Sequence, residues 1–353
     1  TWHGGEPLMR SIDFYKKALE LQKKYAHGKQ IDNVIQTNGT LLTDEWCEFF
    51  AQKHFLVGIS IDGPQEYHDH YRQTSAGKPS WEKVMHGIHL LKKHRVEWNA
   101  MAVVNAYNAE HPLEFYHFFR DNGCQYLQFT PIVERLTEHE DGRTLASLAD
   151  VSHEDNYEDV GNAKKQKENQ EITIADFSVT PEQWGKFLCT IFDDWVRHDV
   201  GKIFVEIFDC TLSNWVGVQP GICAYSKECG HAGVMEHNGD VFSCDHFVFP
   251  EYKLGNIQDK SLIDMLYGEK QQAFSRLKHT SLPRQCKECD MEFACHGECP
   301  KNRFENDKYG EPGLNYLCKG YYEYYTHVAP YMDFMKRELQ AQRPPANIMN
   351  VLK

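Results

Sequence analysis

Apolar and polar positions in the first 130 residues follow two alternating patterns. Short apolar runs predict buried β-strands at 31–36, 55–61, 96–104 and 125–130. Between them, apolar residues recur with helical spacing and predict α-helices at 11–25, from Thr43 onward, at 80–94 and at 110–122. This alternation predicts an α/β fold in which helices cover a parallel sheet, as either a barrel or a doubly wound sheet.

Two of these helices are specified by particular side chains. Thr43 is a suitable N-cap, and the helix that it begins would bury Trp46, Phe49 and Phe50. In the helix predicted at 11–25, the residues with helical spacing are Phe14, Ala18, Leu21 and Tyr25.

The pattern changes at two places further along the chain. Residues 134–171 are polar, acidic and poor in large apolar side chains, which predicts a long loop or lid with partial disorder. Helical spacing resumes through Trp184, Leu188, Ile191 and Trp195. After about residue 222 the chain contains short strands, turns and cysteines, with a hairpin expected around Asn238-Gly239. We therefore predict domains at 1–215 and 216–341, with a C-terminal tail at 342–353.

Eight of the twelve cysteines lie in the last third of the chain. Their spacing is C-x5-C-x14-C, followed by C-x2-C-x5-C-x3-C-x18-C. Eight thiolates make two sets of four, and four thiolates are the usual complement of one iron–sulfur cluster or one structural zinc ion. These cysteines are Cys223, Cys229, Cys244, Cys286, Cys289, Cys295, Cys299 and Cys318.

Composition narrows the class of protein. Disulfide frameworks suit small secreted domains, whereas 353 residues can form one or two hydrophobic cores. The sequence shows neither a signal peptide nor an apolar run that could span a membrane, which predicts a cytoplasmic protein with reduced cysteines. The net charge of −13 argues against a nucleic-acid-binding surface, and 13% aromatic residues suffice for pockets that grip a peptide.

Polar motifs with glycine occur at three successive strand ends. Gly4-Gly5-Glu6-Pro7 opens the chain, Thr37-Asn38-Gly39-Thr40 ends one strand, and Ser60-Ile61-Asp62-Gly63-Pro64 ends the next. Loops at the carboxyl ends of parallel strands face a common cavity, and glycine lets the backbone approach a ligand closely. Each motif alone is explained as a tight turn, but three in succession indicate a binding site.

The Gly-Gly-Glu-Pro turn, the turn around Asp62-Gly63 and the cysteine spacing together resemble radical S-adenosylmethionine enzymes with a C-terminal SPASM domain. Within that superfamily, the chain is most similar to anaerobic sulfatase-maturating enzymes, from Thr1 to about Tyr325. The resemblance implies a partial (β/α)6 barrel followed by a small cysteine-rich iron–sulfur domain with a β-hairpin and C-terminal helices.

One part of the family pattern is missing. The signature C-x3-C-x2-C, which lies upstream of the Gly-Gly-Glu-Pro turn in the family, does not occur in this sequence. The other cysteines are scattered singly and cannot replace it: Cys47, Cys124, Cys189 and Cys210. We therefore expect an N-terminally truncated piece that is unable to generate the radical, with a third [4Fe–4S] cluster only in the full-length protein.

The resemblance also implies two auxiliary [4Fe–4S] clusters. One would be held by Cys223, Cys229, Cys244 and Cys299. The other would be held by Cys286, Cys289, Cys295 and Cys318. Asp245 matches the family's general base, which would take the thiol or hydroxyl proton of the target side chain while an auxiliary cluster accepts an electron. Without the family match, Asp245 would be interpreted as a turn residue that binds nearby backbone N–H groups.

Residues of the strand-end motifs are implied to bind S-adenosylmethionine. Gly5 and Glu6, with Gly4 beside them, would receive its amino group. The rest of its polar edge would be lined by Thr37, Asn38, Ser60 and Asp62. Arg72 would meet its carboxylate or would be an ordinary surface residue. His3 stands where many relatives carry Gln, which leaves the choice between a Cys and a Ser substrate open.

Three functions remain open from the sequence. The favoured one is a radical oxidoreductase that converts Cys or Ser in a sulfatase Cys/Ser-x-Pro/Ala-x-Arg segment to formylglycine, with an electron donor such as flavodoxin or ferredoxin. The second is a radical enzyme that matures a small ribosomal peptide. The third is a non-enzymatic binding module stapled by two zinc ions in the same eight thiolates.

Overall fold

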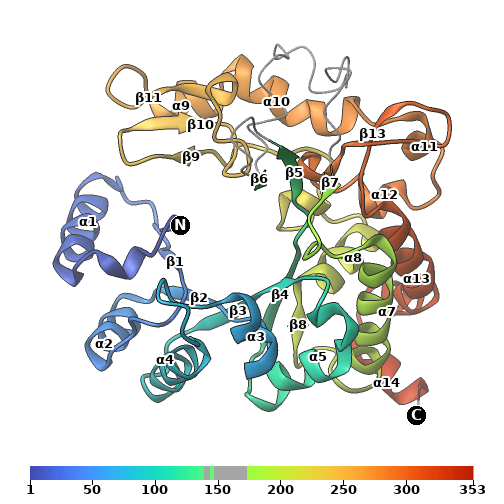
Figure 1. Cartoon of the computed structure of the whole chain (residues 1–353), viewed down its shortest axis with the longest axis horizontal. Coiled ribbons are helices and arrows are strands. Elements are labelled where there is room, and N and C mark those ends of the chain that lie inside the picture. The colour runs from blue at the N-terminus through green and yellow to red at the C-terminus, as the bar shows by residue number, and fades with distance from the viewer. Residues whose placement is uncertain (139–143, 147–172, 353) are drawn as a thin grey trace. The chain divides into compact units, whose positions relative to one another are not determined.

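The structure is a computed structural model that describes residues 1–138, 144–146 and 173–352. The chain divides into two compact units, and each is discontinuous in sequence (Figure 1). The first unit comprises Thr1–Pro131 and Asp193–Glu206, and the second comprises Ile132–Phe192 and Ile207–Lys353. The domain boundary near residue 215 stays a prediction, and the nearest change of unit lies between Glu206 and Ile207.

A five-stranded sheet forms the centre of the first unit, in the order β1-β2-β3-β4-β8. Its strands are β1 (Val34–Thr37), β2 (Leu56–Ser60), β3 (Trp98–Val104), β4 (Tyr126–Pro131) and β8 (Phe204–Val205). Every neighbouring pair is parallel, which confirms the predicted α/β class. The four predicted strands are present, but β8 was not predicted because two residues are too few to show a hydrophobic period.

Helices cover this sheet, and four of them were predicted from the sequence, whereas α3 was not. They are α1 (Ile12–Tyr25), α2 (Asp44–Lys53), α3 (Gln65–Tyr71), α4 (Trp81–Lys93) and α5 (Pro112–Asp121), with short 3-10 turns η1 (Pro7–Met9) and η2 (Asn108–Glu110). Thr43 caps α2, because its Oγ1 accepts a hydrogen bond from the Trp46 N–H at 3.3 Å. Trp46, Phe49 and Phe50 are buried, as predicted from the sequence.

The apolar residues whose spacing predicts α1 do not form its buried face. Phe14, Leu21 and Tyr25 are exposed to 44%, 43% and 60%, whereas Tyr15 is only 2% exposed. The Tyr15 hydroxyl donates to the Pro7 carbonyl at 2.9 Å, so its burial leaves no polar atom unpaired. The helix was therefore predicted correctly, but its packing is decided by a residue outside the apolar series.

Three small antiparallel sheets are present among the described residues of the second unit. Strand β5 (Arg135–Glu138) pairs with β6 (Thr144–Ala146) and β7 (Thr173–Ile174). Strands β5 and β6 lie inside the segment predicted as a loop at 134–171, because β5 pairs with β6 on one side and with β7 on the other. Residues 139–143 and 147–171 of that segment lie outside the described residues. The remaining strands are β9 (Val234–Met235), β10 (Asp240–Phe242), β11 (Lys253–Asn256), β12 (Glu305–Asn306) and β13 (Pro312–Leu314).

The predicted hairpin around Asn238-Gly239 is present. β9 and β10 pair antiparallel, with Val241 opposite Met235. Gly239 has a φ of +87°, a left-handed conformation that favours glycine at this turn. β11 extends the hairpin into a three-stranded sheet in the order β11-β10-β9. Two of the eight cysteines flank the hairpin, since Cys229 precedes β9 and Cys244 follows β10.

The second unit also contains helices and 3-10 turns. The helices that the structure describes there are α7 (Pro181–His198, which continues into the first unit), α8 (Glu206–Val216), α9 (Leu262–Leu266), α10 (Glu269–Thr280), α11 (Arg284–Lys287), α12 (Glu292–Cys295), α13 (Cys318–Gln340) and α14 (Ile348–Val351). Its 3-10 turns are η4 (Cys223–Tyr225), η5 (Pro250–Tyr252), η6 (Pro300–Asn302) and η7 (Pro345–Asn347). The aromatic rings of Trp184 and Phe208 pack against Tyr321 and Tyr324 of α13, at centroid distances of 6.0 and 5.9 Å. Large buried aromatic residues thus form the core of this unit.

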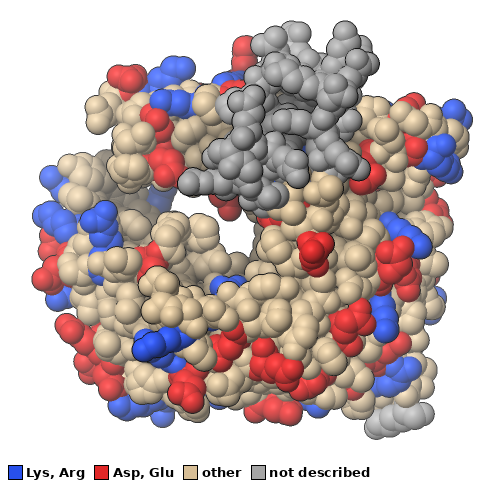
Figure 2. Space-filling model, viewed as in Figure 1, with Lys and Arg blue, Asp and Glu red and all other residues tan. Residues whose placement is uncertain are grey.

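The segment predicted as a C-terminal tail is folded. Glu338 on α13 accepts hydrogen bonds from Arg343 and Asn347, and Ile348 is 2% exposed. Acidic and basic side chains are interspersed over the face drawn in Figure 2. In the parts of the chain that the structure describes, no helix has the length and apolar character needed to traverse a bilayer.

Candidate functional site

In the first unit, one network of hydrogen bonds surrounds the Glu6 carboxylate. Glu6 Oε1 accepts hydrogen bonds from the Leu8 N–H at 2.9 Å and the Thr37 hydroxyl at 2.7 Å. Glu6 Oε2 accepts from the Asn38 N–H at 2.9 Å. The structure therefore brings together two of the three sequence motifs, because Thr37 is the last residue of β1 and Glu6 begins η1 beside it.

The two glycines before Glu6 leave its surroundings open. Gly4 and Gly5 have φ values of +97° and +55°, and no atom lies within 4 Å of a Cβ built on either residue. Glycine is favoured here by the backbone conformation, not by crowding. A carboxylate has about four acceptor positions, of which three are used within the chain, so Glu6 can accept one further donor such as a ligand ammonium group.

The third motif, at the end of β2, forms a separate network. Asp62 is 3% exposed, and its carboxylate receives the Arg72 Nε at 2.6 Å, the Arg72 Nη2 at 3.1 Å and the Val103 N–H at 2.8 Å. Ser60, the last residue of β2, lies at the same sheet edge as Thr37, since β1 and β2 are parallel neighbours. Arg72, predicted to meet a ligand carboxylate, is already paired with a carboxylate of the chain.

His68 belongs to this network and was not expected from the sequence. Its Nδ1 accepts from the Asp62 N–H at 3.2 Å, and its Nε2 lies 3.0 Å from the Ser80 hydroxyl. Burial lowers the pKa of His68 to about 4, so the ring is neutral at physiological pH. A lone histidine on a helix carries no signal of this role, because its partners lie at distant sequence positions.

Four cysteines of the second unit lie near one another around η4 and β10. The Cys223 thiol interacts electrostatically with those of Cys229 and Cys244, and Cys299 interacts with Cys229 and Cys244. We call these four residues the first thiol set. Burial raises the pKa of the Cys229 thiol to about 11 and raises the pKa values of the Cys244 and Cys299 thiols as well.

The other four cysteines form a second group. The Cys286 thiol interacts with those of Cys318 and Cys289, and Cys295 interacts with Cys286 and Cys318. We call these four residues the second thiol set. All four line a cavity of about 720 Å³ that also contacts Tyr325. Burial raises the pKa of Cys286 to about 12 and that of Cys318 to about 11.

Both thiol sets have the chemistry of a metal-cluster site. None of the eight cysteines in the two sets forms a disulfide in the described part of the chain, so their thiols remain available to a metal. Backbone N–H groups donate to several of the sulfurs: His246 to Cys244, Gly297 to Cys295 and Lys301 to Cys299. Such donors stabilise the thiolate form, which metal binding requires, and a bound cation would lower thiol pKa values that burial raises. The residues present therefore fit iron–sulfur clusters.

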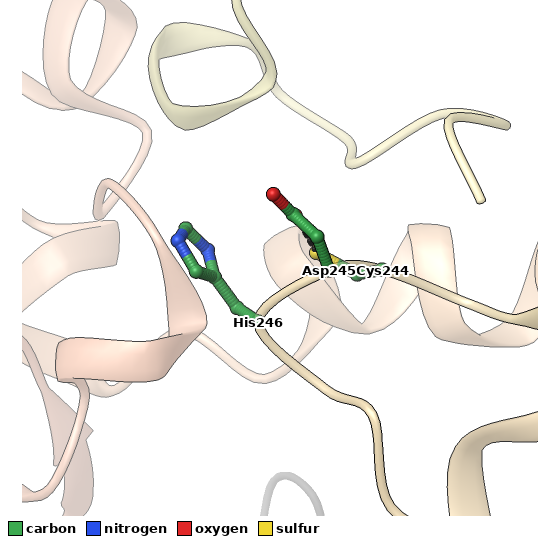
Figure 3. A group of neighbouring side chains, drawn as sticks. All are labelled: Cys244, Asp245 and His246. Carbon is green, nitrogen blue, oxygen red and sulfur yellow. Dashed lines mark hydrogen bonds between the residues drawn. The ribbon is translucent and has the colours of Figure 1, made fainter. Parts of the chain in front are cut away.

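Asp245 lies beside the first thiol set. The Cys244 thiol is 3.3 Å from Asp245 Oδ1, and the Cys299 sulfur is 3.7 Å from His246 Nδ1. Figure 3 shows the Asp245 and His246 side chains projecting from the loop that follows Cys244. One ligand atom from each of Cys244, Asp245 and His246 lies within 4.8 Å of the others. Asp245 is exposed, so its carboxylate is accessible to a second molecule.

Family models match two parts of the chain. Residues 1–119 match the radical SAM superfamily, and residues 227–290 match an iron–sulfur cluster-binding domain named SPASM. The second match includes four of the eight predicted ligands, Cys229, Cys244, Cys286 and Cys289. The loop that carries Asp245 also lies within it. The chemistry of the two thiol sets agrees with the description of this domain.

Relatives are found over the whole chain. It is 66% identical over 353 residues to a serine-type anaerobic sulfatase-maturating enzyme of Bacteroides thetaiotaomicron, covering 100% of this chain and 81% of that protein. It is 29% identical to a cysteine-type enzyme of Clostridium perfringens, over 94% of this chain and 81% of the relative. A solved structure of anSMEcpe with bound AdoMet superposes with a TM-score of 0.78 at 29% identity, over 95% of this chain and 83% of that one.

Proposed function

Because the chain belongs to the anaerobic sulfatase-maturating enzymes, we propose that it oxidises a Cys or Ser side chain of a sulfatase to formylglycine. The proposed substrate is a Cys/Ser-x-Pro/Ala-x-Arg segment of the sulfatase polypeptide. A structure of anSMEcpe that holds both AdoMet and a peptide supports a peptide substrate for this family. The observation that carries the proposal is the position of Asp245, an exposed carboxylate 3.3 Å from a cysteine of the first thiol set.

We propose that the strand-end motifs hold S-adenosylmethionine. Glu6 would accept its ammonium group, because one acceptor position of this carboxylate remains after its three internal hydrogen bonds. The open backbone at Gly4 and Gly5 leaves room for the ligand. Thr37 and Asn38 hold the Glu6 carboxylate in place, and Ser60 lies at the same sheet edge.

We propose a different role in ligand binding for the hydrogen-bond network around Asp62. Asp62 and Arg72 would shape the wall of the ligand site at the end of β2, since their charges already neutralise each other. Arg72 is 29% exposed at its side chain, so one edge of the guanidinium can still approach a ligand carboxylate. The same pair thus supports both the fold of this loop and ligand contact.

We propose that the first thiol set (Cys223, Cys229, Cys244 and Cys299) and the second thiol set (Cys286, Cys289, Cys295 and Cys318) each hold one auxiliary [4Fe–4S] cluster. S-adenosylmethionine and the iron–sulfur clusters, when bound, supply the 5′-deoxyadenosyl radical and accept the electron that the substrate loses. The substrate Cβ loses one hydrogen atom, its thiol or hydroxyl loses one proton and one further electron leaves, which together make a two-electron oxidation. A Ser side chain thereby becomes the aldehyde directly, whereas a Cys side chain becomes a thioaldehyde that water hydrolyses to the aldehyde with release of hydrogen sulfide. Asp245 would take the proton.

Two further features of the function are proposed from chemistry alone. A one-electron donor such as flavodoxin or ferredoxin would supply the reducing electron for radical formation. The eight thiols are free in this structure, which favours a reducing compartment such as the cytoplasm.

Turnover tests the proposed role of Asp245. The assay uses a polypeptide that also carries the C-x3-C-x2-C motif, with synthetic sulfatase peptides containing either Cys or Ser at the target position. Asp245→Asn should lower turnover by roughly 100-fold or more, since general-base catalysis contributes about 10²–10⁴-fold. Its iron content and its affinity for S-adenosylmethionine should equal those of the wild type.

Other results would assign a different function. Unchanged turnover of Asp245→Asn would remove the general base from the proposal. Oxidation of a ribosomal precursor peptide, but of neither sulfatase peptide, would favour the maturation of small peptides. Zinc in place of iron and sulfide, in protein purified without oxygen, would indicate a non-enzymatic binding module.

A further inference from the structure

Two cations, a buried lysine and a partly buried arginine, connect the backbone turns that carry the two thiol sets. Lys278 on α10 is only 1% exposed. Its Nζ donates to the carbonyl oxygens of Cys223, Ala224 and Ser226, with the Ala224 bond at 2.7 Å. All three carbonyls belong to the turn around η4, where the first thiol set begins. The ammonium group therefore holds this turn in position with its three donors.

Arg303 holds a second turn in the same manner. Its guanidinium donates to the carbonyls of His296 at 2.8 Å, Gly297 at 2.8 Å and Glu298 at 3.0 Å. These residues connect Cys295 of the second thiol set to Cys299 of the first, and their φ values are +49°, +66° and +53°. Three consecutive left-handed residues are unfavourable for side chains other than glycine, so a donor that binds all three carbonyls stabilises the turn.

A hydrogen bond joins the two basic residues, and the backbone of the second turn leaves space for the guanidinium group. Arg303 Nη1 also donates to the Lys278 carbonyl. A Cβ on Gly297 would lie 2.7 Å from Arg303 Nη2 and 2.4 Å from Leu282 Cδ2. Gly297 is therefore required both by its conformation and by the space that the guanidinium occupies.

Neither cation has an ion-pair partner within the described part of the chain. Among the described residues, no carboxylate oxygen lies within 4.0 Å of a side-chain nitrogen of Lys278 or Arg303. Burying a charged group without a counter-charge is costly, so a partner of opposite charge is expected nearby. Glu298 is a carboxyl group close enough to interact with both, and burial raises its pKa. One carboxyl group, itself buried, does not balance two cations.

The thiol sets can supply the missing negative charge. Lys278 interacts electrostatically with the thiols of Cys229 and Cys299, both in the first set. Arg303 interacts with those of Cys286 and Cys295 in the second set and with Cys299 in the first. Four thiolates around an iron–sulfur core give a cluster net negative charge, and nearby charge is one of the factors that set its reduction potential.

We propose that Lys278 and Arg303 are positioning residues that raise the reduction potentials of the two auxiliary clusters, Lys278 acting on the first thiol set and Arg303 on both. This inference rests on the proposed iron–sulfur function. A fixed positive charge favours the reduced cluster, which carries one more negative charge than the oxidised one. The two cations would thereby make these clusters better acceptors for the electron that leaves the substrate.

The test compares redox titrations, monitored by electron paramagnetic resonance, of this 353-residue chain after anaerobic reconstitution with iron and sulfide. Lys278→Gln keeps a hydrogen-bond donor but removes the charge, and Arg303→Gln does the same. Arg276→Gln is the matched control, because Arg276 is an exposed cation on the same helix. We expect Lys278→Gln to lower the equilibrium constant for reduction of one cluster about tenfold, which is about 59 mV for one electron.

Arg303→Gln should lower the potentials of both clusters, and Arg276→Gln should change neither. If a Gln variant loses iron while Lys278→Arg or Arg303→Lys retains it, the positive charge is needed to hold the cluster, which also supports the inference. Unchanged potentials in Gln variants with full iron content would overturn it. Loss of iron in both the Gln and the charge-conserving variants would overturn it too. The two side chains would then act through their exact shape and not through their positive charge. Zinc in the wild-type protein would instead contradict the proposed function.

Discussion

Gly185 of α7 and Gly320 of α13 lie in direct backbone contact. A Cβ on Gly320 would be 2.9 Å from the Gly185 nitrogen and 2.2 Å from the Pro181 carbonyl oxygen. A Cβ on Gly185 would be 3.0 Å from the Gly320 Cα. Since Cys318 is the first residue of α13, this close helix crossing determines where one cysteine of the second thiol set lies.

Gly320→Ala should destabilise the chain by about 2 kcal/mol or more, because the methyl group has no space and the two helices must separate. Urea unfolding measures the change in the free energy of unfolding. Gly221→Ala is the control, since no atom lies within 4 Å of a Cβ built there. Equal stability of both variants would show that the helices can separate without cost.

Arg72→Met should lower the free energy of unfolding by about 2 kcal/mol, because it leaves the buried Asp62 carboxylate with one backbone donor, from Val103. A double-mutant cycle with Asp62→Asn in urea unfolding measures the coupling between the two side chains. A coupling energy near zero, together with a large loss of S-adenosylmethionine affinity in Arg72→Met, would instead assign Arg72 to ligand binding alone.

Glu6→Gln should raise the dissociation constant of S-adenosylmethionine at least about tenfold. The amide removes the charge that would attract an ammonium group, and its NH₂ would oppose one of the donors that Glu6 now accepts from Leu8, Thr37 and Asn38. Anaerobic equilibrium dialysis, with a polypeptide that carries the C-x3-C-x2-C motif, measures the affinity. Glu20→Gln, an exposed position on α1, is the control, and similar constants for both variants would contradict the role of Glu6.

Asp209→Asn should stabilise the protein at alkaline pH. Burial raises the pKa of Asp209 to about 7, so the folded state binds its proton more tightly than the unfolded state. The associated stability is fully present below the ordinary pKa of an aspartate and is lost as the pH rises through about 7. The free energy of unfolding of the variant should therefore exceed that of the wild type by as much as about 4 kcal/mol at pH 8.

Urea unfolding at several values between about pH 5 and about pH 8.5 measures this difference. The advantage of Asp209→Asn should grow with pH up to about 7, where the unfolded state has lost the proton that the folded state still holds, and should then level off. An advantage that stays constant with pH would show that Asp209 ionises at its ordinary pKa in the folded state.

The local pattern of the chain was sufficient for much of the fold. Strand and helix alternation gave four of the five parallel strands, and Thr43 gave the start of α2. It could not give β8, which is two residues long and forms because Phe204 and Val205 pair with β4. Nor could it identify Tyr15 as the buried residue of α1, since that depends on a hydrogen bond to Pro7 outside the helix.

By itself, the sequence determined the type of site: eight cysteines at metal-binding spacing, an adjacent Asp245 and glycine-rich strand ends. Those signals are local, because ligand spacing and turn chemistry are properties of neighbouring residues. Only the tertiary structure decided that Arg72 pairs with Asp62 and that Gly185 meets Gly320. It also decided that Lys278 is buried near thiols of the first set, and that the partly buried Arg303 interacts with thiols of both sets. These relationships join residues distant in the chain, and their energies exist only after packing has removed water from between them.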